Sequence, residues 1–186
     1  MIRRVAWPIL LALWLGPAAA APGGDFALTD HDGNPFRLEQ LRGKVVLLLF
    51  GYTSCPDVCP TGLAAMAQVL DGLGPARERV RGLFVTLDPA RDTLARLRRY
   101  VRYFDPAITG LSGSEQEIDV VARRYRVRYR RMESLGENYP VDHSANLYLI
   151  DADGRLAAIV PHGMPAAHTL GLVRRLLAGE GGDDGG

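Results

Sequence analysis

The sequence predicts an α/β fold, and three observations support this prediction. Two apolar runs, residues 45–50 and 80–87, lack the polar alternation of a half-exposed strand. Such runs are typical of strands that are buried on both faces of a parallel sheet. Each run is followed by a segment with the apolar spacing of an amphipathic helix. The only two cysteines of the 186-residue chain, Cys55 and Cys59, lie between the first run and its helix.

The N-terminus has the pattern of a secretory signal peptide. Two arginines precede an apolar run at 5–15, and small residues follow it. This order is typical of a signal peptide over residues 1–20, and we expect cleavage after Ala20. The alternative is an uncleaved anchor, although a membrane span needs roughly 20 apolar residues. We therefore expect an exported, periplasmic protein that is either soluble or anchored to the inner membrane by this segment.

The charge balance argues against nucleic acid as a partner. The sequence has 22 basic and 21 acidic residues, and removal of residues 1–20 takes away two arginines. The remaining 20 basic and 21 acidic residues give a formal net charge of −1, unlike the basic surface of nucleic-acid-binding domains. We expect one domain at residues 25–178 and a disordered Gly/Asp-rich tail at residues 179–186.

The first predicted element of the domain is a β-hairpin. Residues 26–28 and 36–38 form its strands, and residues 30–34 are rich in residue types that form tight turns. His31 lies in this turn and is expected to be a solvated surface residue. The buried strand at 45–50 follows.

The cysteine motif leads into the first predicted helix. Pro60 suits the first helical position because its missing N–H would have no partner there, and Gly74 is expected to stop the helix. After the second buried strand, Asp92 is predicted to cap a helix. A short strand at 108–111 and a helix at 114–124 follow.

An arginine-rich segment comes next. Residues 126–130 alternate with period two, which indicates a half-exposed strand. Six arginines fall between Arg123 and Arg131. They are interpreted either as a docking patch for an acidic partner or as a solvated edge that resists aggregation.

The last third of the chain completes the fold prediction. An irregular loop at 134–142 precedes His143, and a strand is predicted at 146–150. This strand forms a hairpin with residues 156–160, and a helix that begins at Pro165 follows. The order is hairpin, then β-α-β-α-β-α, then hairpin and helix. With a cysteine motif at the first strand–helix junction, this order predicts a thioredoxin-like α/β sandwich, in which helices flank a central mixed sheet that the N-terminal hairpin extends.

The two cysteines allow more than one chemistry. A structural disulfide is common in exported proteins, but a bridge over so short a loop stabilises little. At a strand-to-helix turn, the helix dipole is expected to lower the thiol pKa and make the sulfurs reactive. The spacing of Cys55 and Cys59 is one residue longer than the redox Cys-x-x-Cys motif, which leaves room for a soft metal ion. Thiolates suit Cu(I), and an added imidazole makes Cu(II) acceptable.

One of four histidines is the candidate third ligand. His31 lies in a turn, His168 lies on the last helix and His162 follows the final strand. His143 alone precedes a core strand, in the loop that a thioredoxin-like fold brings beside the cysteine motif.

Three segments resemble the signature segments of the Sco/SenC family. They are residues 51–60 (GYTSCPDVCP), 86–93 (TLDPARDT) and 142–145 (DHSA). The resemblance covers residues 25–178 in order. It implies an exported, thioredoxin-like copper-binding factor for the assembly of cytochrome c oxidase, especially of its binuclear copper site.

The resemblance also implies roles for single residues. Cys55, Cys59 and His143 would be ligands of Cu(I) or Cu(II). Asp88 would lie next to these ligands and help to position them without binding the metal. Asp88 is equally interpreted as a turn residue at the end of a strand. Two features depart from the family, because Leu94 stands where proline is frequent and a short, cleavable segment replaces the usual membrane anchor.

Two functions of different class follow. The favoured hypothesis is a monomeric copper metallochaperone, with no catalytic residue, that delivers copper to the copper-bearing subunit of cytochrome c oxidase and receives it from another copper chaperone. The alternative is an exported thiol–disulfide oxidoreductase in which Cys55 and Cys59 reduce cysteines of an oxidase subunit. A peroxidase with Cys55 as the attacking thiolate is disfavoured because no partner set for peroxide activation is evident.

Overall fold

The computed structural model describes residues 21–132, 136 and 139–179. The signal peptide expected at 1–20 lies outside the described residues, as does the expected tail apart from Gly179. Among the described residues, no helix combines the length and the apolar character that a membrane span requires.

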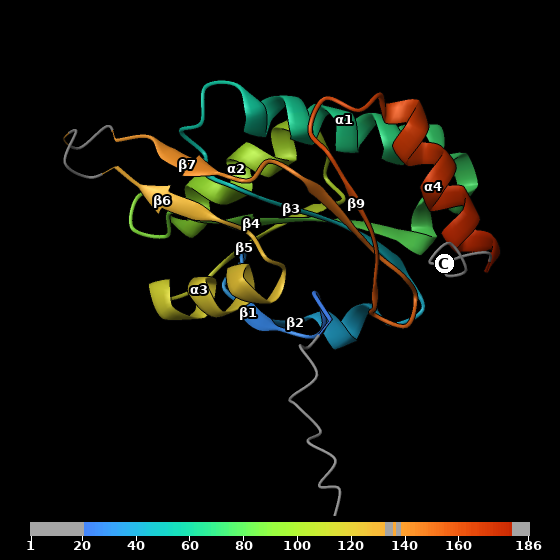
Figure 1. Cartoon of the computed structure of the whole chain (residues 1–186), viewed down its shortest axis with the longest axis horizontal. Helices are drawn as coiled ribbons and strands as arrows, with labels where there is room; N and C mark the ends of the chain where they lie inside the picture. The colour runs from blue at the N-terminus through green and yellow to red at the C-terminus, as the bar shows by residue number, and fades with distance from the viewer. Residues whose placement is uncertain (1–20, 133–135, 137–138, 180–186) are drawn as a thin grey trace, which may run out of the picture.

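A seven-stranded mixed sheet forms the centre of the domain (Figure 1), with the strand order β2-β1-β5-β4-β3-β8-β9. The neighbours β3, β4 and β5 pair in parallel, and the other pairs are antiparallel. The strands are β1 (Ala27–Asp30), β2 (Pro35–Arg37), β3 (Val45–Gly51), β4 (Val80–Thr86), β5 (Ile108–Ser112), β8 (Leu147–Ile150) and β9 (Leu156–Val160). The predicted N-terminal hairpin is therefore present, and it joins the sheet through the contact of β1 with β5.

Helices cover both faces of this sheet. Helices α1, α2 and α4 lie on one face, and α3 lies on the other beside β1 and β2 (Figure 1). Their bounds are α1 (Val58–Gly72), α2 (Leu94–Phe104), α3 (Glu115–Arg124) and α4 (Ala166–Ala178), with two 3₁₀ turns at Leu38–Leu41 and Gly74–Arg79. This arrangement confirms the predicted α/β sandwich.

Strand β3 is the centre of the hydrophobic core. All seven of its residues are buried, as expected for a strand that is covered on both faces. Helix α1 contacts β3 and contributes Leu63, Met66 and Leu70, which are fully buried, to the same hydrophobic core. This packing fixes the end of β3 and the first turn of α1 relative to each other, and the two cysteines lie there.

A second, two-stranded sheet was only half predicted. Strand β6 (Tyr129–Arg131) pairs antiparallel with β7 (Val141–His143), and Tyr129 lies opposite His143. The strand expected at 126–130 starts later because Arg126 has a φ of +56° and belongs to the turn that follows α3. The loop before His143 thus ends in a strand of its own.

Three local predictions were wrong. Helix α1 begins at Val58, so Pro60 is its third residue, where the missing N–H still costs no intrahelical hydrogen bond. The cap of α2 is Thr93, whose hydroxyl accepts from the N–H of Arg96. His31 is buried, with 7% of its surface exposed, and its Nδ1 accepts from the N–H of Gly110 at 2.8 Å.

Candidate metal centre

Two cysteines and one histidine converge above the end of β3. Cys55 lies in the turn after β3, Cys59 is the second residue of α1, and His143 is the last residue of β7. One ligand atom from each residue lies within 4.8 Å of the other two. Cys59 Sγ and His143 Nε2 lie 3.4 Å apart. The structure therefore brings together all three residues that the sequence singled out as copper ligands.

The other three histidines lie elsewhere. His31 is buried beside β5, whereas His162 and His168 are exposed. His162 and Met164 line a groove of about 510 Å³ beside α1 and α4. Among the described residues, His143 alone supplies an imidazole to the cysteine pair.

Gly51 makes room for the sulfur of Cys59. A Cβ atom at this position would lie 2.5 Å from Cys59 Sγ and 3.0 Å from Phe84 Cε2. Real Cβ atoms do not approach so closely, and therefore any larger residue would displace the sulfur or the ring. The last residue of β3 must be glycine for Cys59 to occupy its place.

The hydrogen bonds of His143 orient its ring. Nδ1 lies 3.0 Å from the carbonyl oxygen of Ser144, which only accepts, so Nδ1 carries the proton. In the neutral ring the lone pair is then on Nε2, which faces Cys59. Burial lowers the pKa of His143, which favours this neutral form. The Tyr52 ring packs edge-on against the imidazole with centroids 6.0 Å apart.

The thiol of Cys59 contradicts one prediction. Its pKa is raised, chiefly because burial leaves only 1% of the residue exposed, and a backbone hydrogen bond at Tyr52 opposes the effect only in part. The expected lowering by the helix dipole is therefore outweighed by desolvation. A buried thiol of this kind becomes a thiolate when a bound cation compensates its charge. The donor set of two sulfurs and one imidazole fits a soft ion such as Cu(I).

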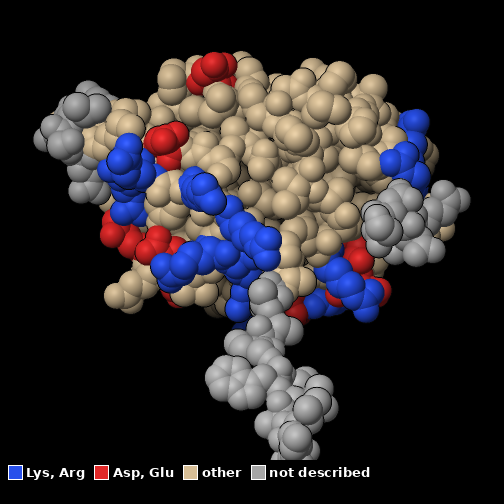
Figure 2. Space-filling model, viewed as in Figure 1, with Lys and Arg blue, Asp and Glu red and all other residues tan. Residues whose placement is uncertain are grey.

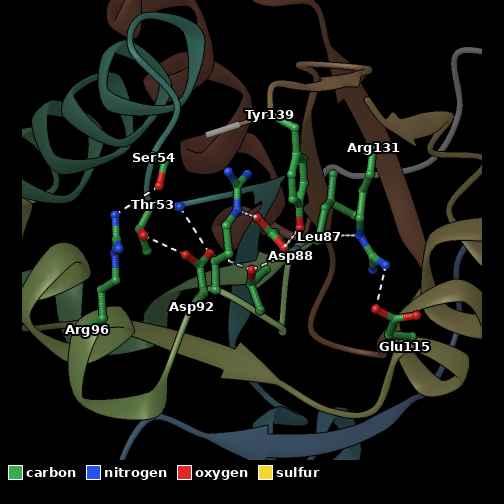
Figure 3. Close-up of polar contacts among 11 residues, drawn as sticks. Thr53, Ser54, Leu87, Asp88, Asp92, Arg96, Glu115, Arg131 and Tyr139 are labelled. Atoms are coloured by element: carbon green, nitrogen blue, oxygen red, sulfur yellow. Dashed lines mark hydrogen bonds and ion pairs between the residues drawn. The ribbon is translucent and has the colours of Figure 1, made fainter. Parts of the chain in front are cut away.

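Asp88 lies in a cluster of polar side chains at the end of β4, near Tyr139 and Asp92 (Figure 3). Its side chain is fully buried, and its Oδ1 accepts from the Tyr139 hydroxyl at 2.8 Å. Its Oδ2 accepts from Nε of Arg91. The Arg91 guanidinium stacks 3.6 Å from the centroid of the Tyr139 ring and lies 5.8 Å from that of Tyr52, which in turn packs against His143. These contacts connect Asp88 to the candidate ligand through two intervening side chains.

Asp92 is a second buried carboxylate, and it does not cap α2 as predicted, because the cap is Thr93. It accepts from the N–H of Thr53 at 3.0 Å and from its hydroxyl at 2.5 Å. The Thr86 hydroxyl donates to it at 2.6 Å. Asp92 thus fixes the turn two residues before Cys55. The signal in the sequence was the cluster of polar residues directly after the buried strand, which marks the edge of the sheet where sites form.

Known proteins are similar to this chain over most of its length. The profile of the SCO1/SenC family matches residues 16–178. An SCO2-like protein of Rickettsia conorii is 42% identical over 135 residues, which are 72% of this chain and 66% of the relative. The mitochondrial SCO2 homolog of Bos taurus is 41% identical over 163 residues, which are 86% of this chain and 61% of the relative. The chain thus spans slightly less than two thirds of these relatives.

Solved structures are similar over most of the domain. The copper-bound ScoI of Arabidopsis thaliana is 34% identical with a TM-score of 0.78, covering 86% of this chain and 99% of that one. The copper-bound ScoI of Bradyrhizobium japonicum is 39% identical with a TM-score of 0.78, covering 84% of this chain and all of that one.

Proposed function

This chain belongs to the SCO1/SenC family, and from that premise we propose that it is a copper metallochaperone for the assembly of cytochrome c oxidase. The observation that carries the proposal is the convergence of Cys55, Cys59 and His143, whose ligand atoms lie within 4.8 Å of one another. Copper-bound structures of the same fold support the choice of metal.

The proposed cargo is held by groups of different hardness. The thiolates of Cys55 and Cys59 prefer Cu(I), and the imidazole of His143 extends the site to Cu(II). Binding at Cys59 displaces the thiol proton, so copper affinity rises with pH. His143 needs no proton loss because its lone pair already faces Cys59. The copper-bearing subunit of the oxidase is the proposed acceptor, and another copper chaperone is the proposed donor.

Asp88 is proposed to support the site without binding the metal. Its hydrogen bond to Tyr139 holds the segment that precedes β7 against the end of β4. Arg91 neutralises the carboxylate and fills the space between Tyr139 and Tyr52. The cluster therefore keeps the strand that ends at His143 close to the cysteines.

A copper titration tests the site. Reduced wild-type protein is titrated with Cu(I) and with Cu(II) beside Cys55→Ser and His143→Ala, and His162→Ala is the matched control because this histidine is exposed nearby. We expect the wild type and the control to bind one copper ion per chain. The other two variants should lose copper binding or show a changed spectrum of the bound copper. Binding that survives both ligand substitutions would refute the three-ligand site.

A thiol–disulfide oxidoreductase is the second candidate, because both cysteines are free and their sulfurs lie within 4.8 Å. One thiolate would attack a partner disulfide, release a partner thiolate and form a mixed disulfide. The second cysteine would then close the Cys55–Cys59 disulfide, so two electrons pass to the partner. The raised pKa of Cys59 disfavours it as the attacking group. Full biological activity of His143→Ala would favour this candidate.

The place of action is proposed to be outside the cytoplasm, in the bacterial periplasm. This rests on the signal-peptide pattern of residues 1–20. Mass spectrometry of the mature N-terminus decides between a cleaved, soluble form that starts at Ala21 and an anchored form that keeps the segment.

A further inference from the structure

A set of exposed arginines lies along the segment that leads into β6, the strand that pairs with β7 and its last residue His143 in a two-stranded ribbon. Arg126, Arg128 and Arg130 are exposed and alternate along the chain into β6; they are called the arginine row below. Figure 2 shows Lys and Arg side chains gathered over the part of this face where β6 and the end of α3 lie in Figure 1.

The arginine row differs from the adjacent arginines because the adjacent ones have ion-pair or hydrogen-bond partners within the chain. Arg131 pairs with Glu115, and Arg123 lies 3.8 Å from Asp119. Arg124 donates to the backbone oxygen of Asp25. In the described part of the chain, no ion pair engages any member of the arginine row. Their charges are thus available to a carboxylate from outside.

The position of the row relative to His143 is fixed by the ribbon. Arg128 and Ser144 are joined by three hydrogen bonds. Ser144 N donates to Arg128 O at 2.9 Å, Arg128 N donates to Ser144 Oγ at 3.1 Å, and Ser144 Oγ donates to Arg128 O at 3.4 Å. Arg130 lies opposite Asp142 in the strand register. A hollow of about 370 Å³ is lined by Arg128, Tyr129, Arg130, Asp142, His143 and Ser144. A partner that fills this hollow contacts a candidate metal ligand and two arginines together.

We propose that the arginine row is the docking surface for an acidic protein surface, which it places next to His143. Guanidinium groups bind carboxylates through two parallel hydrogen bonds, which gives orientation as well as attraction. The inference rests on the proposed function, since it names the chemistry of the partner that would exchange copper at this site. The single acidic residue of the hollow, Asp142, leaves the hollow with a positive balance.

A protein is favoured over an anionic membrane by the place of the charges. Arg128 and Arg130 line the same hollow as His143, where an exchange partner has to sit. Arg126 also borders residues 21–23 at the start of the domain, next in sequence to the N-terminal segment that could serve as an anchor. The experiment therefore has to distinguish binding to an acidic protein from binding to an anionic membrane.

The experiment reverses the charge of the arginine row. Arg→Glu is used because the edge of the ribbon then stays charged. The test variant is Arg126→Glu/Arg128→Glu/Arg130→Glu in the full chain. The matched control is Arg99→Glu/Arg155→Glu/Arg175→Glu, which reverses three exposed arginines on α2, on the β8–β9 turn and on α4. Both variants have the same net charge. The probes are a deca-glutamate peptide and vesicles of three parts phosphatidylcholine to one part phosphatidylglycerol, each at 20 and 200 mM NaCl.

The expected result is peptide binding at 20 mM salt that is at least fivefold weaker at 200 mM. Peptide-induced NMR shifts in the wild type should centre on β6 and β7. The test variant should lose at least fivefold in affinity, and the control less than twofold. No peptide binding by the wild type, equal loss in both variants, or binding of vesicles in place of the peptide would overturn the proposal. No probe contains copper, so this result is separate from the titration of the metal site.

Discussion

The hydroxyl of Tyr139 lies 2.8 Å from Asp88 Oδ1 and joins the segment before β7 to the end of β4. Tyr139→Phe removes one hydrogen bond to a fully buried carboxylate, and we expect a loss of about 1–3 kcal/mol in the free energy of unfolding. If the contact also positions His143, the absorption spectrum of the Cu(II)-loaded protein should change. Urea unfolding and the spectrum are compared with Tyr103→Phe, since Tyr103 is 84% exposed. Equal stability and equal spectra in both variants would contradict the positioning role.

Gly51→Ala should damage the metal centre from within the core. The new methyl group would lie 2.5 Å from Cys59 Sγ, so the sulfur or Phe84 must move, at a cost of about 1–3 kcal/mol. We expect at least tenfold weaker Cu(I) binding, measured by competition with a chromophoric chelator. Gly171→Ala in α4 is the control, because its Cβ would meet nothing within 4 Å and alanine favours a helix by up to about 1 kcal/mol. Unchanged Cu(I) affinity in Gly51→Ala would show that Cys59 tolerates displacement.

Asp92→Ala should unfold more readily than any exposed aspartate variant. It leaves three donors from Thr53 and Thr86 without their acceptor, and we expect a loss of about 3 kcal/mol. Because Thr53 precedes Cys55 by two residues, alkylation of Cys55 in the folded protein should become faster. Asp153→Ala is the control, since its carboxylate is 69% exposed. A loss no larger than that of the control would mean that water replaces the carboxylate without cost.

The stability of the metal-free protein should fall as the pH decreases below about 6.5. Burial lowers the pKa of His31 from its ordinary value of 6.5, so the unfolded chain takes up a proton at a higher pH than the folded one. The stabilisation is therefore complete above pH 6.5 and is lost as the pH falls through the folded-state pKa. We expect the free energy of unfolding between pH 7.5 and 5 to decrease less in His31→Gln than in the wild type. The same pH dependence of the free energy of unfolding in both proteins would show that His31 does not contribute to it.

Prediction from the sequence succeeded where the signal was local. The uninterrupted apolar run of β3 and the helical spacing of Leu63, Met66 and Leu70 each fall within one element. The candidate ligands Cys55 and Cys59 were singled out in the same way, from their place between a strand and a helix. His143 required the assumption of a fold, because it lies 84 positions from Cys59.

Prediction failed where contacts between distant segments determine the surroundings of a residue. His31 was expected in solvent, but the pairing of β1 with β5 covers it. Asp92 was expected to cap a helix, but Thr53 lies 39 positions away and binds it. The raised pKa of Cys59 has the same origin, since its burial depends on the whole core. None of these contacts is visible in a window of ten or twenty residues.

The separation of Cys59 and His143 along the chain has a consequence for the lifetime of the protein. An ion that is held by both residues cross-links positions 84 apart, and the unfolded chain does not hold it in this way. By mass action, copper at one hundred times its dissociation constant adds about 2.7 kcal/mol to the free energy of unfolding. Proteases act on the opened chain, whose population falls by the same factor of about one hundred. The copper-free protein is therefore expected to be degraded faster than the copper-bound protein, and the abundance of the protein should follow the copper supply.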